Sequence, residues 1–252
     1  MGITMLVCAM GDVHGDQYLD LLKEGRDKLG ACDLVLLAGD VTDTNDLEIY
    51  GQVLGTLREL TDAEILAVFG NEEYDSSHLE YRERFRIVFL EEESKDLRFD
   101  DLKVKVVGTT GSLDRPTWWQ RTNVPDIWVR YKERLSKTSS LLEKGDADVM
   151  VLLMHYAPTY ATLEGEKPSS FPEMGSLAFE GLVLERRPDL ALHAHAHRGR
   201  RKAALVKRQR SLEDYSAKGS EVMVHNVSLP VVGRPTFFEI KGEESGVSVR
   251  EL

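Results

Sequence analysis

The sequence contains only two cysteines, Cys8 and Cys32, among its 252 residues. Both lie in or beside apolar segments, so we expect buried free thiols, and a disulfide framework does not account for the fold. No apolar run approaches the ~20 residues of a membrane-spanning helix, so we expect no membrane partner. The N-terminus lacks the basic start and the cleavage site of a signal peptide, which predicts a cytoplasmic location.

Positive charge is also scarce. The chain has 32 Lys and Arg against 43 Asp and Glu, which gives a formal net charge of -11 and a sequence pI near 5.2. Such a surface disfavours bulk binding of DNA or RNA, so nucleic acid is a less favoured partner. Repeats and linkers are absent as well. With 42% hydrophobic residues the chain can bury a sizeable core. We expect one domain over residues 1–252, with a helical insertion at 112–147.

A short apolar run, residues 5–10, is followed by the polar segment Gly11-Asp12-Val13-His14-Gly15-Asp16. The run is too short for a helix and predicts a buried strand, after which the two glycines let the backbone turn sharply. Asp12 and His14 are two residues apart, so an extended backbone points both side chains to the same side. A carboxylate and an imidazole aimed at one point suit a divalent metal. Alone, the segment is better explained as a loop with a capping aspartate.

Four further apolar runs end in polar residues of the same kind. They predict strands over residues 33–38, 65–69, 149–154 and 190–192. The polar residues that follow are Asp40 and Asp43, Asn71 with Glu72 and Glu73, His155, and the histidines His193, His195 and His197. In open α/β sheets, ligands bind outside the carboxyl ends of the strands. Five such breaks in one chain therefore indicate a shared site.

The segments between the first strands predict helices. Tyr18, Leu19, Leu22 and Leu29 fall on one face of a helix of about three turns, and Asn45 is the expected N-cap of the next helix. The first seventy residues thus alternate strand and helix, which predicts a parallel sheet with right-handed crossovers.

The later part of the chain gives a more mixed pattern. Residues 97–107 indicate a β-hairpin. A capping-box pattern of Ser77 and Glu80 precedes a short helix, and Asn123 and Pro125 precede a long one with an apolar stripe that includes Trp128. The remaining expectations are a loop at 168–172, a helix at 177–184, and antiparallel strands at 222–224, 236–240 and 247–249.

The ordered set of motifs between Gly11 and His197 resembles the calcineurin-like metallophosphoesterases. The motifs are Asp-x-His, Gly-Asp-x-x-Asp, Gly-Asn-x-Glu, a single His, and His-x-His. Two positions depart from the family pattern, because Glu72 stands where the family usually has histidine and Ala194 where it usually has glycine. The resemblance implies an α/β fold, a sandwich of two mixed β-sheets flanked by helices.

The resemblance also implies two divalent metal ions bridged by Asp40. It gives the first metal Asp12, His14, Asp40 and His197, and the second Asp40, Asn71, His155 and His195. This set mixes oxygen and nitrogen ligands without a thiolate, which suits Mn, Fe or Zn better than Ca or a structural zinc site. The residues that we assign to catalysis are Asp40, Asn71, Glu72 and His155.

The implied activity is metal-dependent hydrolysis of a phosphate ester by a metal-activated hydroxide. The favoured substrate is a phosphodiester or a small phosphorylated molecule, so a small anionic ester is the expected partner and manganese a suitable metal. A nuclease of the DNA-repair branch of the family is an alternative that the acidic composition disfavours. A non-catalytic scaffold, like the retromer subunit that shares the fold, is another alternative, although such a protein need not keep metal ligands.

Several polar residues near the motifs have structural explanations. We expect His193 to be structural or to orient a ligand, and His78 has no motif around it. His225 follows a strand, which leaves a role at the edge of the site open. Asp43 and Glu73 are expected to orient ligands rather than to bind metal.

Two surface features stay open. Trp118 and Trp119 are expected in a loop with Arg115 and Arg121, either stacking on a nucleobase or forming a hydrophobic plug. The basic run over residues 198–210, which includes Arg198, Arg200 and Arg201, is either a solvated surface or a collector of anionic substrate.

Overall fold

The alternation of strand and helix at the start of the chain builds one mixed sheet. The computed structural model describes residues 3–206, 221–243 and 246–252. The first sheet has the order β12-β11-β1-β2-β3-β4, with β1 to β4 parallel and β11 antiparallel to β1 and β12. Its strands are β1 (Thr4–Met10), β2 (Leu34–Leu37), β3 (Glu64–Ala67), β4 (Val88–Phe89), β11 (Thr236–Glu243) and β12 (Gly246–Glu251).

The expected hairpin opens the second sheet, whose order is β5-β6-β7-β8-β10-β9. Strands β6, β7, β8 and β10 run parallel, and the edge strands β5 and β9 are antiparallel to their neighbours. The strands are β5 (Glu93–Phe99), β6 (Leu102–Thr109), β7 (Val149–Met154), β8 (Leu190–His193), β9 (Lys202–Leu205) and β10 (Val222–Asn226). The sequence missed β9, and β10 is parallel to β8, so the expectation of only antiparallel strands at the end of the chain was wrong for β10.

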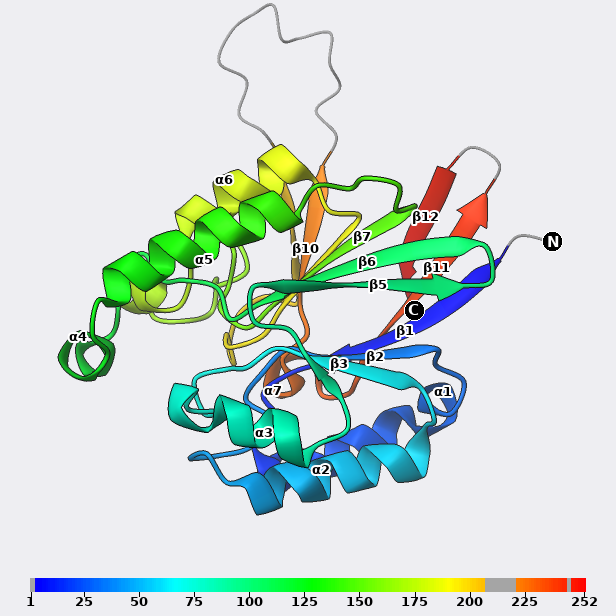
Figure 1. The fold of residues 1–252 in the computed structure, drawn as a ribbon, viewed down its shortest axis with the longest axis horizontal. Helices are drawn as coiled ribbons and strands as arrows, with labels where there is room; N and C mark the ends of the chain where they lie inside the picture. The colour runs from blue at the N-terminus through cyan, green and yellow to red at the C-terminus, as the bar shows by residue number, and fades with distance from the viewer. Residues whose placement is uncertain (1–2, 207–220, 244–245) are drawn as a thin grey trace, which may run out of the picture.

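The two sheets pack face to face, with helices on both outer faces (Figure 1). One buried cluster joins Val7 and Leu36 of the first sheet to Val106 and Val151 of the second. The helices are α1 (Arg26–Leu29), α2 (Leu47–Leu60), α3 (His78–Arg84), α4 (Trp118–Asn123), α5 (Ile127–Leu141), α6 (Leu177–Arg186) and α7 (Leu229–Val232). The predicted α/β sandwich of two mixed sheets is confirmed. In the described residues, no helix is both long and apolar enough to cross a membrane.

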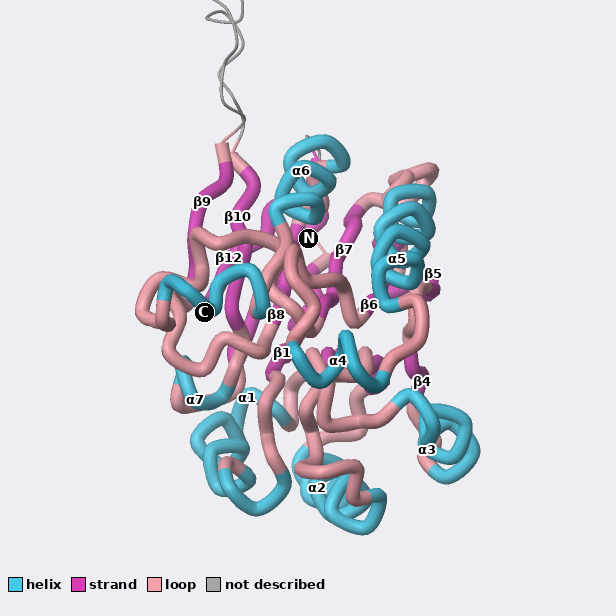
Figure 2. Tube along the Cα trace, turned by 90° about the vertical axis from the view of Figure 1, so that its left-hand side faces the viewer, coloured by secondary structure: helices cyan, strands magenta, loops and turns pink. Residues whose placement is uncertain are grey.

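The carboxyl ends of the parallel strands of both sheets meet at one edge. In Figure 1 they point to the left, and Figure 2 looks onto that edge. Backbone hydrogen bonds join the strand ends, from Gly11 N–H to the Val227 carbonyl at 3.1 Å and from Ala194 N–H to the His155 carbonyl at 3.1 Å. All five predicted motif loops therefore gather at this edge.

The predicted helix at residues 18–29 is broken into short pieces. Two 3-10 helices, Gly15–Gln17 and Leu19–Gly25, lead into the single turn of α1. Leu22 and Leu29 still face the core. Gly25 interrupts the segment where it packs against Phe237, since a Cβ at residue 25 would lie 2.8 Å from that ring.

The cap of α2 was assigned one residue too early. The Asp46 carboxylate accepts the N–H groups of Glu48 and Ile49 at 2.9 and 3.0 Å. Asn45 has a left-handed φ of 61°, and its amide bonds Ser77 Oγ at 2.7 Å and the Tyr74 N–H at 2.8 Å. Ser77 is thereby diverted, and the expected capping box at α3 does not form.

The tryptophan pair was also placed wrongly, because Trp118 and Trp119 begin α4 rather than a loop. Asn123 ends this helix, and α5 begins only after Asp126. Trp128, expected in the buried stripe of the long helix, is 51% exposed. The expected loop at 168–172 is a 3-10 helix, Pro168–Glu173, while the predicted helix from residue 177 is confirmed as α6.

The capping contacts give a test of the local assignment. Asp46→Ala should lower the free energy of unfolding by about 1 kcal/mol, because two N–H groups of α2 lose their acceptor. Urea unfolding followed by circular dichroism measures the change. The matched control is Gln52→Ala on the exposed face of α2, which should leave the midpoint unchanged. An equal midpoint for Asp46→Ala and the parent protein would contradict the assignment of the cap.

Candidate metal centre

The first group of candidate ligands lies at the ends of β1 and β8. Asp12, His14 and His197 each offer one ligand atom, and these atoms lie within 4.8 Å of one another. The Nε2 atoms of His14 and His197 are 3.4 Å apart, and Nε2 of His197 is 3.4 Å from Oδ2 of Asp12. Two imidazole nitrogens and one carboxylate oxygen therefore converge on a point.

The second group comes from the loops after β2, β7 and β8. Asp40, His155 and His195 again offer atoms within 4.8 Å of one another. Nε2 of His155 lies 3.4 Å from Oδ2 of Asp40 and 3.0 Å from Oδ1 of Asn71. Nδ1 of His155 is 2.9 Å from the Ala38 carbonyl. This contact puts the proton of a neutral imidazole on Nδ1 and leaves Nε2 as the ligand atom.

Backbone contacts hold the two groups side by side. The N–H of Asp12 donates to the Gly39 carbonyl at 3.0 Å, and the N–H of His14 donates to the Asp40 carbonyl at 3.1 Å. The N–H of His195 donates to Oδ2 of Asp12 at 2.8 Å. The predicted ligand set is thus brought together from five loops, with Asp12 and Asp40 in adjacent turns.

The ligand-bearing turns adopt backbone conformations that non-glycine residues rarely take. Asp12, His14, Asp40 and His195 have φ values of 54°, 47°, 49° and 69°. Residues held in this left-handed region concentrate at functional sites, where surrounding contacts maintain them. Gly39 has φ 84°, and a Cβ there would lie 2.7 Å from Nδ1 of His155. Only glycine lets this turn approach the histidine so closely.

The buried carboxylate of Glu73 joins two of these turns. It accepts N–H groups from Asp40 at 2.9 Å, Val41 at 2.8 Å, Thr42 at 3.2 Å and Gly70 at 2.8 Å. Burial, and next the charge of Asp40, raise the pKa of Glu73 to about 7. Glu73 therefore orients the loops that carry Asp40 and Asn71, as the sequence predicted for an orienting group.

Glu72 also makes specific contacts beside the centre. Its Oε1 accepts a hydrogen bond from Nδ2 of Asn71 at 3.0 Å, and its Oε2 accepts the N–H of Thr44 at 3.0 Å. The N–H of Glu72 itself donates to Oδ1 of Asp40 at 2.8 Å. Because the Asn71 amide nitrogen is turned to Glu72, its oxygen is the atom that faces His155.

The charges of Asp40 and His195 suit a cation, whereas His155 would have to give up a proton to bind one. Burial opposes the ionisation of Asp40, but the nearby His155 outweighs it and lowers the pKa of this carboxyl. Burial would likewise lower the pKa of His155, but the charge of Asp40 raises it to about 9. Burial lowers the pKa of His195 to about 3, so this imidazole is neutral. An ionised aspartate and a neutral histidine are the forms that bind metal.

The buried carboxylate of Asp12 gives a further reason to expect a divalent metal here. Oδ1 of Asp12 is buried and has no hydrogen-bond partner in the described part of the chain. A buried carboxylate oxygen without a partner is costly, and a cation beside it would satisfy it. The donors are carboxylates, imidazoles and one amide, which matches Mn, Fe or Zn.

Comparison with known proteins bears on this geometry. The sequence profile of the calcineurin-like phosphoesterase family matches residues 5–199. The chain belongs to this family. A search of curated protein sequences found no match.

Solved structures share the fold at low identity. The phosphopantetheinyl hydrolase PptH of Mycobacterium tuberculosis aligns with a TM-score of 0.61 at 15% identity, over 90% of each chain. The purple acid phosphatase PPD1 of yellow lupin seeds aligns with a TM-score of 0.58 at 13% identity, over 100% of this chain and 52% of that one. The phosphoesterase YfkN of Bacillus subtilis gives 0.55 and 14%, over 100% of this chain and 89% of that one.

The remaining histidines of this family member lie outside both groups of ligand atoms. His193 is buried and its Nδ1 contacts the Ala194 carbonyl at 2.7 Å. His78 stacks on Phe69 with ring centroids 3.6 Å apart. His225, on β10, lies 3.5 Å from the carboxylate of Glu251, on β12 of the first sheet. Asp43, by contrast, lies 3.2 Å from Nδ1 of His14, in the expected orienting position.

The basic run is partly neutralised. Arg200 pairs with Glu164 at 2.5 Å, and both Arg201 and Lys202 pair with Glu251 at 2.9 Å. These pairs favour a solvated surface over a collector of substrate for these three residues. Residues 207–210 of the run lie outside the described residues.

Sequence reasoning missed Tyr156, which contacts a candidate ligand, and left open a role at the edge of the site for Asn226, which follows a predicted strand. The ring of Tyr156 packs edge-on against His195, with centroids 4.9 Å apart. The amide of Asn226 donates to the Ala196 carbonyl at 2.8 Å and so supports the loop that carries His195 and His197. Tyr156 directly follows His155, and Asn226 follows a strand, but neither position belongs to a motif.

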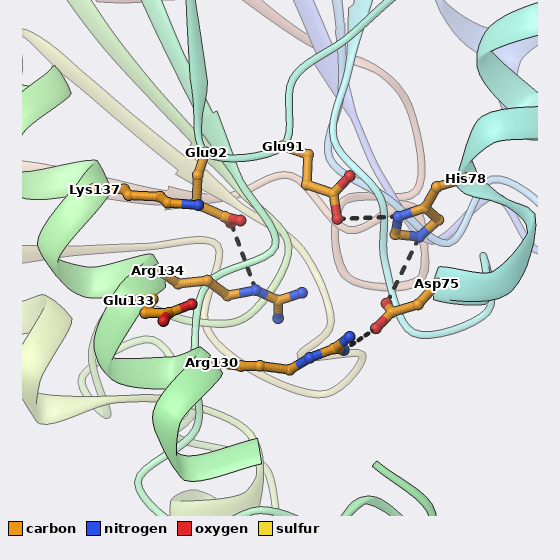
Figure 3. A pocket seen from close by; sticks show the side chains of 8 residues that line it. All are labelled: Asp75, His78, Glu91, Glu92, Arg130, Glu133, Arg134 and Lys137. Carbon is orange, nitrogen blue, oxygen red and sulfur yellow. Dashed lines mark hydrogen bonds and ion pairs between the residues drawn. The ribbon is translucent and has the colours of Figure 1, made fainter. Parts of the chain in front are cut away.

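A charged pocket of about 280 Å³ lies between α5 and the start of α3, beside the loop that carries Asn71 (Figure 3). Figure 3 shows Arg130 reaching Asp75 and Arg134 reaching Glu92, so ion pairs cross the pocket. His78 contacts Glu91 at 3.1 Å on one side and the Glu73 carbonyl at 3.1 Å on the other. The contacts of Arg130, Asp75 and His78 therefore brace the loop after Asn71 from inside the pocket.

The role of Glu73 can be tested by Glu73→Gln. An amide offers one acceptor oxygen in place of two, so buried N–H groups lose partners and the free energy of unfolding should fall by about 1–3 kcal/mol. Affinity for added Mn²⁺ should also fall, measured by titration calorimetry on metal-stripped protein. The matched control, Glu59→Gln on the exposed surface of α2, should change neither quantity. Parent-like stability and affinity in Glu73→Gln would remove Glu73 from this role.

Proposed function

We propose that the protein is a dinuclear metal-dependent phosphoesterase that hydrolyses a phosphodiester or a small phosphorylated molecule. The observation that carries the proposal is a pair of ligand groups at one edge of the sandwich. Within each group, the ligand atoms lie within 4.8 Å of one another. Family membership supports it. The presence of a full ligand set disfavours a non-catalytic scaffold, and the net charge of -11 disfavours a nuclease.

In this proposal the first metal is held by Asp12, His14, Asp40 and His197. The second is held by Asp40, Asn71, His155 and His195. When bound, two cations would neutralise phosphate oxygens and lower the pKa of water. The donor set suits Mn, Fe or Zn.

The chain's own residues prepare this chemistry. The Ala38 carbonyl keeps Nε2 of His155 directed at Asp40, and Glu72 keeps the amide oxygen of Asn71 directed at His155. Asn71 is exposed and His197 half-exposed, whereas Asp12 and Asp40 are buried. Substrate therefore enters from the side of Asn71 and His197, while the bridging carboxylate stays shielded from water.

Glu72 in this proposal holds Asn71 and does not donate a proton. Both of its carboxylate oxygens already accept hydrogen bonds, from the Asn71 amide and the Thr44 N–H. A leaving oxygen would then depart without a proton from this residue.

Asp40 as the bridging ligand gives the first test. Asp40→Asn should remove most bound metal and essentially all ester hydrolysis while the fold persists, because an amide does not bridge two cations as a carboxylate does. Metal content by mass spectrometry and hydrolysis of bis(p-nitrophenyl) phosphate measure both effects. Asp62→Asn on the surface is the control. Normal turnover in Asp40→Asn would overturn the assignment, and a parent protein without bound metal after reconstitution would favour the scaffold.

Glu72 gives a second test, through the dependence of kcat/KM on leaving-group pKa. The parent protein should hydrolyse p-nitrophenyl esters well and alkyl esters poorly, since a general acid is worth about 10²–10⁴ in rate. Glu72→His should help alkyl esters more than aryl esters and flatten the dependence. Glu72→Gln, which keeps an acceptor for Asn71, should keep the steep dependence. A shallow slope in the parent protein would mean that another group already supplies the proton.

A further inference from the structure

The two tryptophans of α4 are exposed on the same edge of the molecule as the candidate metal centre (Figure 1, Figure 2). Trp118 is 70% exposed and Trp119 is 57% exposed. An aromatic side chain stabilises a protein by burying its apolar surface, and these two bury little of it. A hydrophobic plug therefore does not explain them. In the described part of the chain, neither indole nitrogen has a hydrogen-bond partner.

The helix that carries them is tied directly to the centre. Gln120 forms a capping box with Thr117, and its amide nitrogen donates to the Tyr156 hydroxyl at 3.0 Å. Its amide oxygen accepts from the Tyr131 hydroxyl at 3.0 Å. Tyr156 in turn packs against His195 and His155, with centroids 4.9 and 5.3 Å apart.

The position of α4 agrees with these contacts. In Figure 1 α4 lies beyond the carboxyl ends of the strands, and in Figure 2 it lies in front of them. A small apolar cluster of Leu113, Ile127, Tyr131 and Tyr156 packs below the connection from α4 to α5. The six-residue helix α4 is thus linked to the centre through Gln120 and Tyr156, while its tryptophans contribute little to the core.

A charge accompanies the two indoles. Arg121 is exposed and has no ion pair among the described residues. Residues three apart on a helix are neighbours, so Arg121 lies on the same face as Trp118. Arg115, expected beside them, is occupied by Glu173 at 3.0 Å. An indole face with a free guanidinium suits a flat ring on an anionic molecule.

We propose that Trp118 and Trp119 form a subsite that stacks on a planar aromatic group carried by the phosphate ester, with Arg121 attracting its negative charge. The inference rests on the proposed function, because it names the substrate class of the same centre. The ring is either a heteroaromatic base or a simple aryl group, which share the stacking chemistry. The charged pocket of Figure 3 is a poorer place for a ring, because seven of its eight lining residues are charged and none is Trp, Tyr or Phe.

The test uses tryptophan fluorescence, because all three tryptophans of the chain lie in α4 and α5. Four probes that the protein cannot hydrolyse as esters are titrated into the metal-loaded protein. Adenosine is compared with ribose, and phenylphosphonate with methylphosphonate. The ring-bearing member of at least one pair should quench the fluorescence and its ring-free partner should not. Which pair responds tells a base from an aryl group.

Variants assign the signal to the subsite. Trp118→Leu and Trp119→Leu should raise the apparent Kd of the ring-bearing probe roughly fivefold or more, as expected for a lost stacking contact. Trp128→Leu, the matched control on α5, should leave Kd unchanged. All three side chains are largely exposed, so unfolding midpoints should stay close to that of the parent protein. A Kd that is unchanged in the double variant Trp118→Leu/Trp119→Leu overturns the proposal.

Kinetics separate this proposal from the proposed function. Bis(p-nitrophenyl) phosphate and methyl p-nitrophenyl phosphate share a leaving group and differ in the other ester group. The ratio of their kcat/KM values should fall about fivefold in the tryptophan variants. Ring-specific quenching without hydrolysis of any ester overturns the phosphoesterase and leaves the subsite. Hydrolysis with no ring preference in either assay overturns the subsite and leaves the phosphoesterase.

Discussion

The candidate centre depends on one buried carboxylate, that of Glu73. It accepts N–H groups from Asp40, Val41, Thr42 and Gly70, which belong to the turns after β2 and β3. Burying a carboxylate is expensive unless hydrogen bonds compensate it, and these four donors do so. The same bonds hold Asp40 in its left-handed conformation, with φ 49°. One side chain therefore sets both the spacing of two ligand-bearing turns and the strain that one of them carries.

The sandwich and the gathering of the motif loops could be predicted from the sequence, because both follow from strong local signals. The apolar runs before Gly11, Gly39 and Gly70 are short and end abruptly, which marks buried parallel strands. Parallel strands that share a sheet end at the same edge, so the polar residues after them must meet. The strand β9, with the sequence Lys-Ala-Ala-Leu, lacks an apolar run of this kind and was missed.

The local predictions that were wrong concern positions decided by contacts between segments that are distant in sequence. Asn45 looks like a helix cap, but its amide is used by Tyr74 and Ser77, so Asp46 caps α2 instead. Both residues have capping side chains, and nothing local to residues 45 and 46 separates them. The same limit applies to α4, since its anchor is the contact between Gln120 and Tyr156 from another loop.

The two departures from the family pattern are absorbed where they occur. Position 194 does not require glycine, because Ala194 is not among the described residues with a positive φ. The Cβ of Ala194 occupies the space that a side chain at residue 11 would need. A Cβ at residue 11 would lie only 2.5 Å from it, so the glycine is required at residue 11, just after β1, instead. Glu72 replaces a ring by two oxygens, and each oxygen finds a donor, in Asn71 and in Thr44. The substitution at 194 is therefore one of packing alone, whereas that at 72 changes which groups lie beside the candidate metal centre.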